Sequence, residues 1–178
     1  IGRGIAHHLG KGGAAIVVAE LKPDLMNVAC AELDALGVAN LGVVCDVQQR
    51  DAIDAMVAST VERFGRVDCL VNNAQTFRPM APIAEVSERD LDVFYTSGVK
   101  GSLWAMQAVH PHMRAQGWGR IVNFASSMGI TGGRGFAAYN ASKEAIRALT
   151  RTAAREWALD GVVVNAIAPA AAAHHGAA

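Results

Sequence analysis

The chain carries the apolar run AAIVVA at residues 14–19, and four further short runs of the same kind follow it. Continuous apolar runs rich in β-branched residues are typical of buried parallel strands, because helices cover both faces of such a sheet. We therefore predict an α/β fold with strands at residues 14–19, 39–45, 69–72, 120–124 and 162–167.

Longer stretches with apolar residues at helical spacing separate these runs. They cover residues 1–9, 24–36, 49–64, 88–115 and 136–159. In the third stretch Ile53, Val57 and Val61 recur every four residues, which is the pattern of a helix with one buried face. Because single strands alternate with helices, the sequence predicts a parallel sheet with helices on both of its faces.

Length and composition limit the class of protein and its partners. A chain of 178 residues fits one domain, which we place at residues 1–169, followed by a poorly structured tail at residues 170–178. Apolar residues make up 52% and charged residues 18%, which excludes intrinsic disorder. No apolar run reaches the roughly 20 residues of a membrane helix, so we expect no membrane partner. The 16 basic and 16 acidic side chains balance, which argues against nucleic acid and favours a small molecule as the partner.

Cysteine and histidine usage gives no sign of a disulfide scaffold or a metal. The three cysteines form no Cys-x-x-Cys pair, and we expect a reducing, cytoplasmic location. The six histidines stand in close pairs without neighbouring carboxylates or cysteines, so we predict no metal site. The chain begins Ile1-Gly2 without an initiating methionine, and we expect its N-terminus to be truncated.

Tyr139 and Lys143 are four residues apart in the helix predicted at residues 136–159. This spacing places a phenol and an ammonium on one face of the helix, one turn apart. A free phenol titrates at about pH 10, and an adjacent cation stabilises its ionised form. The two groups can therefore act together as a general acid and base, although ordinary exposed pairs show the same spacing.

Ser126 lies thirteen residues before Tyr139, just after the strand predicted at residues 120–124. Open α/β sheets bind their ligands at the carboxyl ends of the strands. A hydroxyl at this position can hold a substrate oxygen, or it can cap the turn that follows the strand. Ser127 is the weaker candidate for the same role, because the spacing favours Ser126.

The order of serine, tyrosine and lysine resembles the classical short-chain dehydrogenase/reductase family. Ile1-Gly2 matches the end of the family's glycine-rich turn, Asp46-Val47 its adenine-side acid, and Asn72-Asn73-Ala74 its central Asn-Asn-Ala-Gly motif. The run VNAIAP, which ends at Pro169, resembles the strand that leads into the family's Pro-Gly turn. The resemblance covers about residues 1–170. It implies a Rossmann-like doubly wound parallel sheet, with the first and last strands missing from this chain.

The resemblance implies an NAD(P)-dependent oxidoreductase that transfers a hydride between the cofactor and an alcohol or ketone. Tyr139 is then the acid and base, Lys143 favours the ionised phenol and holds the nicotinamide ribose, and Ser126 orients the substrate oxygen. The cofactor supplies the hydride. The alternative is a catalytically silent relative that binds a dinucleotide or assembles with other chains, or an inactive fragment. The resemblance also implies a homo-oligomer, a dimer or a tetramer, packed through the helices at residues 88–115 and 136–159.

The expected cofactor contacts begin at Gly2, where a glycine turn delivers phosphate to a helix N-terminus. Eighteen residues later Glu20 closes a predicted strand, in the setting of an acid that binds the adenosine ribose hydroxyls. A carboxylate there repels a ribose phosphate, and Leu21 rather than an arginine follows it, so we favour NAD over NADP. Lys22 keeps NADP open as the alternative. The remaining expected contacts are Asp46, Val47, Asn73, Ala74, Tyr139, Lys143 and Pro169.

Ala170 stands where the family's Pro-Gly turn has its glycine, and two residues of the expected site also depart from the family pattern. Gly98 stands where the family carries an asparagine that holds a water of the proton relay, so the relay either uses another arrangement or is impaired. Gln75 stands where the family carries glycine, and its amide either contributes to the site or crowds it. In addition, the strands at residues 14–19 and 69–72 would flank the missing strand. Unless these two strands pair with each other, each has a row of backbone N–H and C=O groups without a strand partner.

Overall fold

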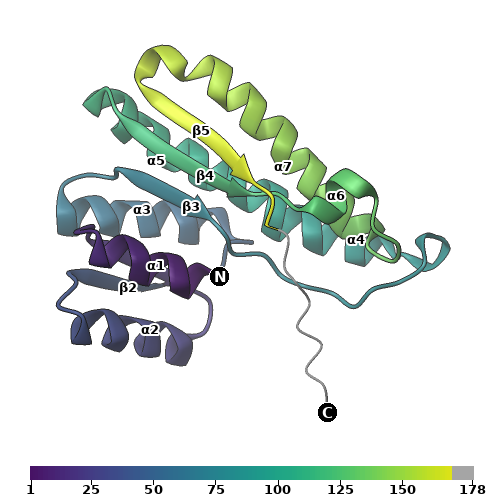
Figure 1. Cartoon of the computed structure of the whole chain (residues 1–178), viewed down its shortest axis with the longest axis horizontal. Coiled ribbons are helices and arrows are strands. Elements are labelled where there is room, and N and C mark those ends of the chain that lie inside the picture. The colour runs from purple at the N-terminus through teal and green to yellow at the C-terminus, as the bar shows by residue number, and fades with distance from the viewer. Residues whose placement is uncertain (170–178) are drawn as a thin grey trace.

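The computed structural model describes residues 1–169, and the tail predicted at residues 170–178 lies outside the described residues. Strands and helices alternate along the chain (Figure 1). The strands are β1 (Ile16–Glu20), β2 (Asn40–Val44), β3 (Cys69–Asn72), β4 (Gly119–Phe124) and β5 (Val162–Ile167). The α-helices are α1 (Gly2–Lys11), α2 (Pro23–Ala35), α3 (Arg50–Phe64), α4 (Glu88–Phe94), α5 (Gly101–Gln116), α6 (Ser127–Thr131) and α7 (Ala137–Glu156). The predicted α/β class is confirmed.

The strands form two parallel ladders. β1 pairs with β2, and β4 lies between β3 and β5 in the second ladder. Within residues 1–169 no ladder joins β1 to β3. β1 and β3 therefore do not pair with each other, and each has one edge without a strand partner in the described part of the chain. In Figure 1 the first ladder and α2 form one end of the molecule, and β4, β5 and α7 form the other.

Helices cover both faces of the first ladder. On one face Ile16 of β1 packs with Leu33 of α2. On the other face Ala19 packs against a cluster that contains Ile53 of α3 and Ala105 of α5. Because neighbouring side chains of a strand point to opposite faces, β1 is covered on both sides, as a buried parallel strand requires.

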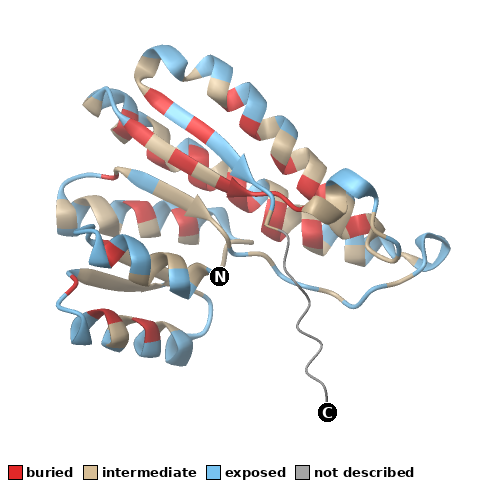
Figure 2. Cartoon of the chain, viewed as in Figure 1, coloured by how far each residue is buried: buried red, intermediate tan, exposed pale blue. Residues whose placement is uncertain are grey.

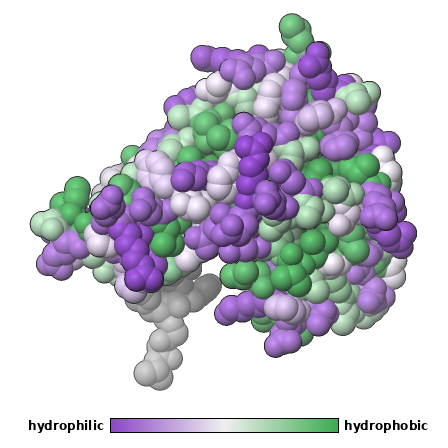
Figure 3. All heavy atoms as spheres, turned by 180° about the vertical axis from the view of Figure 1, so that it is seen from behind, coloured by the Kyte–Doolittle hydropathy of each residue, from purple (hydrophilic) through white to green (hydrophobic). Residues whose placement is uncertain are grey.

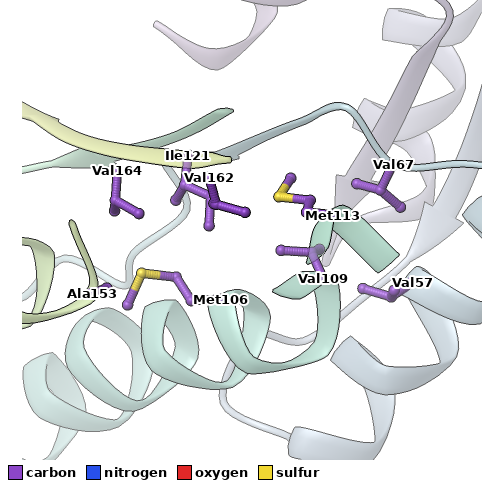
Figure 4. Close-up of a cluster of buried hydrophobic side chains, with 9 residues drawn as sticks. All are labelled: Val57, Val67, Met106, Val109, Met113, Ile121, Ala153, Val162 and Val164. Atoms are coloured by element: carbon purple, nitrogen blue, oxygen red, sulfur yellow. The ribbon is translucent and has the colours of Figure 1, made fainter. Parts of the chain in front are cut away.

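The main core lies between the second ladder and the helices α5 and α7 (Figure 4). Side chains from α5 interlock here with Ile121 of β4 and with Val162 and Val164 of β5. The alternate residues of β5 face outward, and Val163 is 43% exposed. Figure 2 shows this alternation along β5. Within the described residues, therefore, only one face of β5 is covered.

The segment from residue 88 to residue 116 differs from the single regular helix that the sequence predicted. A π-helical turn, η2 (Tyr95–Lys100), separates α4 from α5. Side chains satisfy carbonyls at this turn, since the Ser97 hydroxyl donates to the Val93 carbonyl at 2.7 Å. Wide turns of this kind occur where a side chain enters the helical ladder, often at functional sites. Helix α6 was not predicted, because five residues are too few to show a period.

A chain of buried amides links the elements beneath the site. Asn72 Nδ2 donates to Asn123 Oδ1 at 2.8 Å, and Asn123 Nδ2 donates to Thr150 Oγ1 at 2.9 Å. Asn123 is fully buried. Paired in this way, the three side chains connect β3, β4 and α7 without leaving the Asn123 amide unsatisfied.

The surface mixes polar and apolar side chains. Viewed from behind, the largest hydrophobic area lies at the end that holds the first ladder and α2 (Figure 3). Leu25 and Val28 of α2 are among the exposed apolar residues. Among residues 1–169, none of the helices has the length and apolar character needed to cross a bilayer.

Gly161→Ala tests the turn that leads into β5. Gly161 has φ +75°, and a Cβ there would lie 2.0 Å from the Gly117 carbonyl oxygen. We expect the positive φ to cost about 1–2 kcal/mol and the clash to cost about 1–3 kcal/mol more. Urea denaturation followed by circular dichroism measures the loss.

The matched control for that turn is Gly37→Ala. Gly37 has φ +69°, but nothing lies within 4 Å of the added Cβ. It should therefore show only the cost of the positive φ. Equal losses in the two variants would contradict the close approach of the two turns.

Candidate active site

Ser126 is the N-cap of α6 and lies two residues after the end of β4. Its side-chain oxygen accepts a hydrogen bond from the Met128 amide at 3.2 Å, so the capping role that the sequence allowed is present. A hydroxyl that accepts in this way still has its own hydrogen to donate. Ser126 can therefore cap α6 and donate to a ligand oxygen at the carboxyl end of β4.

Tyr139 and Lys143 lie in the first two turns of α7. The Lys143 ammonium is 5.5 Å from the centre of the Tyr139 ring, and it donates to the Phe124 carbonyl at 2.7 Å. Lys143 is only 6% exposed, so the two residues are not an ordinary surface pair. Burial lowers the pKa of Lys143 from 10.5 to about 8.

Helix α6 approaches the start of α7 closely enough to bring the three predicted catalytic residues into one region. A Cβ at Gly129 would lie 3.3 Å from the Asn140 carbonyl oxygen and 3.4 Å from the Lys143 Cβ. The helix capped by Ser126 thus packs against the turn that carries Lys143. Because Lys143 also bonds to Phe124, these groups meet at the end of β4.

Aromatic side chains surround the Tyr139 ring. Its centre is 5.7 Å from that of Phe94 and 6.0 Å from that of Phe136, in edge-to-face geometry. A small pocket beside Tyr139 is lined by these rings and by Met80, with Arg78 and Asp90 as its charged groups.

The two charges of this pocket pair with each other. Arg78 Nε donates to Asp90 Oδ1 at 3.0 Å. Hydrogen bonds from the Ser87 hydroxyl and from Arg78 lower the pKa of Asp90. With its charges paired, the pocket favours an uncharged group next to the phenol.

Among the predicted cofactor residues, Glu20, Asp46 and Asn73 lie at the carboxyl ends of the first three strands, and Gly2 begins α1. A Cβ at Gly2 would lie 2.9 Å from Asn73 Nδ2, so the start of α1 lies close to the Asn73 side chain that follows β3. Glu20 ends β1, and its carboxylate accepts from the Lys22 amide at 3.0 Å. Asp46 follows β2 and accepts from the Gln48 amide at 2.9 Å.

The other predicted cofactor contacts outside α7 are Val47, Ala74 and Pro169. The Val47 carbonyl packs against α5, where a Cβ at Gly101 would come within 2.8 Å of it. Ala74 is exposed, and Pro169 follows β5, which pairs with β4. No hydrogen bond recorded within residues 1–169 links the side chains of Glu20 and Asp46 to those of the catalytic residues.

The N-terminus of α1 can receive an anion. Its N-cap, Ile1, makes no side-chain hydrogen bond, and its first turn holds no acidic residue. The first amides of a helix lack partners within the helix and attract negative charge. Glu20 adds a hydrogen-bond acceptor at the end of β1. The residues present therefore fit a dinucleotide with its phosphates at α1. Across residues 1–169, no three His, Cys, Asp or Glu side chains cluster as metal ligands would.

Sequence reasoning missed one residue of this region, Ser142. It lies between Tyr139 and Lys143, is fully buried, and accepts a hydrogen bond from Gln75 Nε2 at 3.1 Å. A serine inside the Tyr-x-x-x-Lys turn was the available signal. Its partner Gln75 is 67 positions away, so no local pattern could have connected the two.

The chain is similar to known proteins over almost its whole length. A family model described as short chain dehydrogenase matches residues 1–175. The (2S)-[(R)-hydroxy(phenyl)methyl]succinyl-CoA dehydrogenase subunit BbsD of Thauera aromatica is 37% identical over 169 residues, which cover 95% of this chain and 67% of that protein. Sorbitol dehydrogenase of Cereibacter sphaeroides is 36% identical over 170 residues, with 95% and 65% covered.

A solved structure of NAD+-bound xylitol dehydrogenase has the same fold. It is 38% identical, with a TM-score of 0.92 over 94% of this chain and 65% of that chain. The chain thus spans about two thirds of the length of these relatives.

Lys143→Met tests whether the buried ammonium is as costly as its surroundings indicate. The pKa is 10.5 in the ordinary state and about 8 in the fold, so between these values the unfolded chain binds more protons. Stability should therefore rise with pH across this window, by on the order of 3 kcal/mol, since one pKa unit is about 1.4 kcal/mol. This rise should disappear in Lys143→Met.

Urea denaturation at a series of pH values measures the difference. Lys11→Met, which removes an exposed lysine, is the control and should keep the rise. The same pH dependence in the wild type and in Lys143→Met would show that Lys143 does not titrate as a buried cation.

Proposed function

The chain belongs to the short chain dehydrogenase family, and from this premise we propose that it is an NAD(P)-dependent oxidoreductase acting on an alcohol or a ketone. The observation that carries the proposal is the buried Lys143 ammonium, 5.5 Å from the Tyr139 ring and bonded to the end of β4. An ammonium in this place has a cost in stability. The positive charge of this ammonium stabilises the ionised form of the Tyr139 phenol.

In the proposed reaction the chain holds the substrate oxygen and moves one proton. Ser126 donates its free hydroxyl hydrogen to that oxygen, and the Tyr139 hydroxyl gives the oxygen a proton during ketone reduction. During alcohol oxidation the phenolate takes this proton back, and the Lys143 charge favours that ionised state. When bound, a nicotinamide cofactor supplies or accepts the hydride.

We propose that the domain at residues 1–169 holds the dinucleotide along the carboxyl ends of β1 to β3. Gly2 and the uncapped amides of α1 would receive the phosphates, and Glu20 would bind the adenosine ribose hydroxyls. Asp46 and Val47 would meet the adenine, Asn73 and Ala74 would line the ribose, and Pro169 would lie near the nicotinamide. NAD is preferred to NADP, because the Glu20 carboxylate repels a ribose phosphate.

The pocket beside Tyr139 supports an uncharged small-molecule substrate. Aromatic rings line it, and its Arg78 and Asp90 charges are paired with each other. Of the named relatives, sorbitol dehydrogenase is named for an uncharged polyol, whereas the Thauera aromatica subunit is named for a phenyl-bearing succinyl-CoA derivative. A silent dinucleotide-binding relative is the second candidate, and the presence of Gly98 and Gln75 at the site favours it.

We further propose a cytoplasmic homo-oligomer, a dimer or a tetramer, that packs through α5 and α7. The cytoplasmic setting is supported by Cys30, Cys45 and Cys69, all of which are free thiols.

Tyr139→Phe removes the proposed acid and base while keeping the ring. We expect turnover of an alcohol and ketone panel to fall at least about a hundredfold, while NADH affinity, measured by titration calorimetry, stays within about twofold. Ser127→Ala should keep its activity, whereas Ser126→Ala should lose most of it. Saturable NADH binding by a wild type that turns over no substrate in the panel would favour the silent relative.

Glu20→Ala tests the choice of dinucleotide. Without the carboxylate, we expect the ratio of NAD to NADP affinity to fall at least about tenfold, which is about 1.4 kcal/mol. Calorimetric titration with both dinucleotides gives the ratio. Asp24→Ala removes a nearby exposed acid of α2 and is the control. An unchanged ratio in Glu20→Ala would mean that Glu20 only caps the turn at Lys22.

A further inference from the structure

Gln75 reaches from the segment after β3 into the space between η2 and α7. Its Nε2 donates to Ser142 Oγ at 3.1 Å and lies 3.4 Å from the Phe94 carbonyl oxygen. The single hydrogen of the Ser142 hydroxyl goes to the Tyr139 carbonyl at 2.7 Å. The amide group that faces Ser142 must therefore be the donor Nε2, which fixes the orientation of the Gln75 side chain.

The other end of this amide is unsatisfied. Gln75 Oε1 is buried and has no hydrogen-bond partner within residues 1–169. A buried acceptor without a partner lowers stability. The contribution of Gln75 to the fold therefore comes from the contacts of its Nε2, and its Oε1 adds none.

Gly98 is what admits the Gln75 amide. A Cβ at residue 98 would lie 2.5 Å from Gln75 Nε2 and 2.9 Å from its Cδ. The backbone of Gly98 is helical and has no positive φ, so its conformation does not require glycine. Glycine is unfavourable inside a helix. A side chain at residue 98 would therefore displace the Gln75 amide from its position beside Ser142.

The same segment is tied to η2 at a second point. The Thr76 amide donates to Ser97 Oγ at 3.2 Å, and Ser97 donates in turn to the Val93 carbonyl. Ser97 is 1% exposed. Thr76 thus bonds to the wide turn and Gln75 to Phe94 just before it, while Gln75 also bonds to Ser142 in the second turn of α7.

We propose that Gln75 is a positioning residue, whose amide ties Phe94, where η2 begins, to Ser142 in the second turn of α7 and so fixes where the turns that carry Tyr139 and Lys143 lie against η2. The path runs from Gln75 Nε2 through Ser142 Oγ to the Tyr139 carbonyl. Gly98, which has no side chain, leaves the space that the Gln75 amide occupies. The inference rests on the proposed function, because positioning matters only where Tyr139 transfers a proton.

A double-mutant cycle tests the coupling. Gln75→Ala removes the amide, and Gly98→Ala pushes it away from Ser142. We expect each variant to lower kcat about tenfold, with less than about a twofold change in KM for NADH, and to move the pH midpoint of kcat upward. The double variant should be no worse than either single variant, because the two substitutions remove one contact.

Gln116→Ala is the matched control, since it removes an amide that bonds to the Val67 and Trp118 carbonyls at the far end of α5. It should keep kcat and its pH midpoint. Additive losses in the cycle, or an unchanged pH midpoint in Gln75→Ala, would overturn the proposal.

Hydrogen exchange separates a failure of this proposal from a failure of the proposed function. If the wild type has no turnover, the function fails, but exchange at residues 140–143 still tests the coupling. Faster exchange in Gln75→Ala and in Gly98→Ala, with no further gain in the double variant and none in Gln116→Ala, supports it. Unchanged exchange in Gln75→Ala overturns it.

Discussion

The hydrogen bond from the Lys143 ammonium to the Phe124 carbonyl is the contact on which the site depends. It joins the second turn of α7 to the end of β4, two residues before Ser126. Tyr139 lies one turn earlier on the same helix. A buried ammonium is costly unless it is bonded, so this contact also limits where α7 can lie. The position of Tyr139 and Lys143 relative to Ser126 therefore depends on one charged group.

Local patterns were enough to predict the strands and the Tyr139 and Lys143 pair. β4 and β5 are short apolar runs, and a spacing of four residues on a helix places two side chains together whatever the rest of the fold does. The turn η2, helix α6 and the contact of Gln75 with Ser142 were beyond such reasoning. Each depends on packing between segments far apart in the sequence, which no local period records.

Buried polar groups serve two different purposes in this structure. The amide of Asn123 is satisfied by Asn72 and Thr150, and this chain of bonds holds two strands and a helix together. Gln75 is satisfied on one side only, and Lys143 is buried at a lowered pKa. The fully paired Asn123 thus supports the scaffold, whereas Gln75 and Lys143 lie in the region of Tyr139. This is the division expected when part of a fold's stability is given up for chemistry.

The fit of Gln75 over Gly98 also constrains how this protein can evolve. Any side chain at residue 98 meets the Gln75 amide, so such a change displaces that amide while the glutamine is present. After residue 75 has become small, the same change no longer meets the three side-chain atoms that lie nearest to it now. A lineage would therefore exchange these two residues in a fixed order, through an intermediate that has neither side chain. Descendants should carry one of the two complementary pairs, and mixed sequences should be rare.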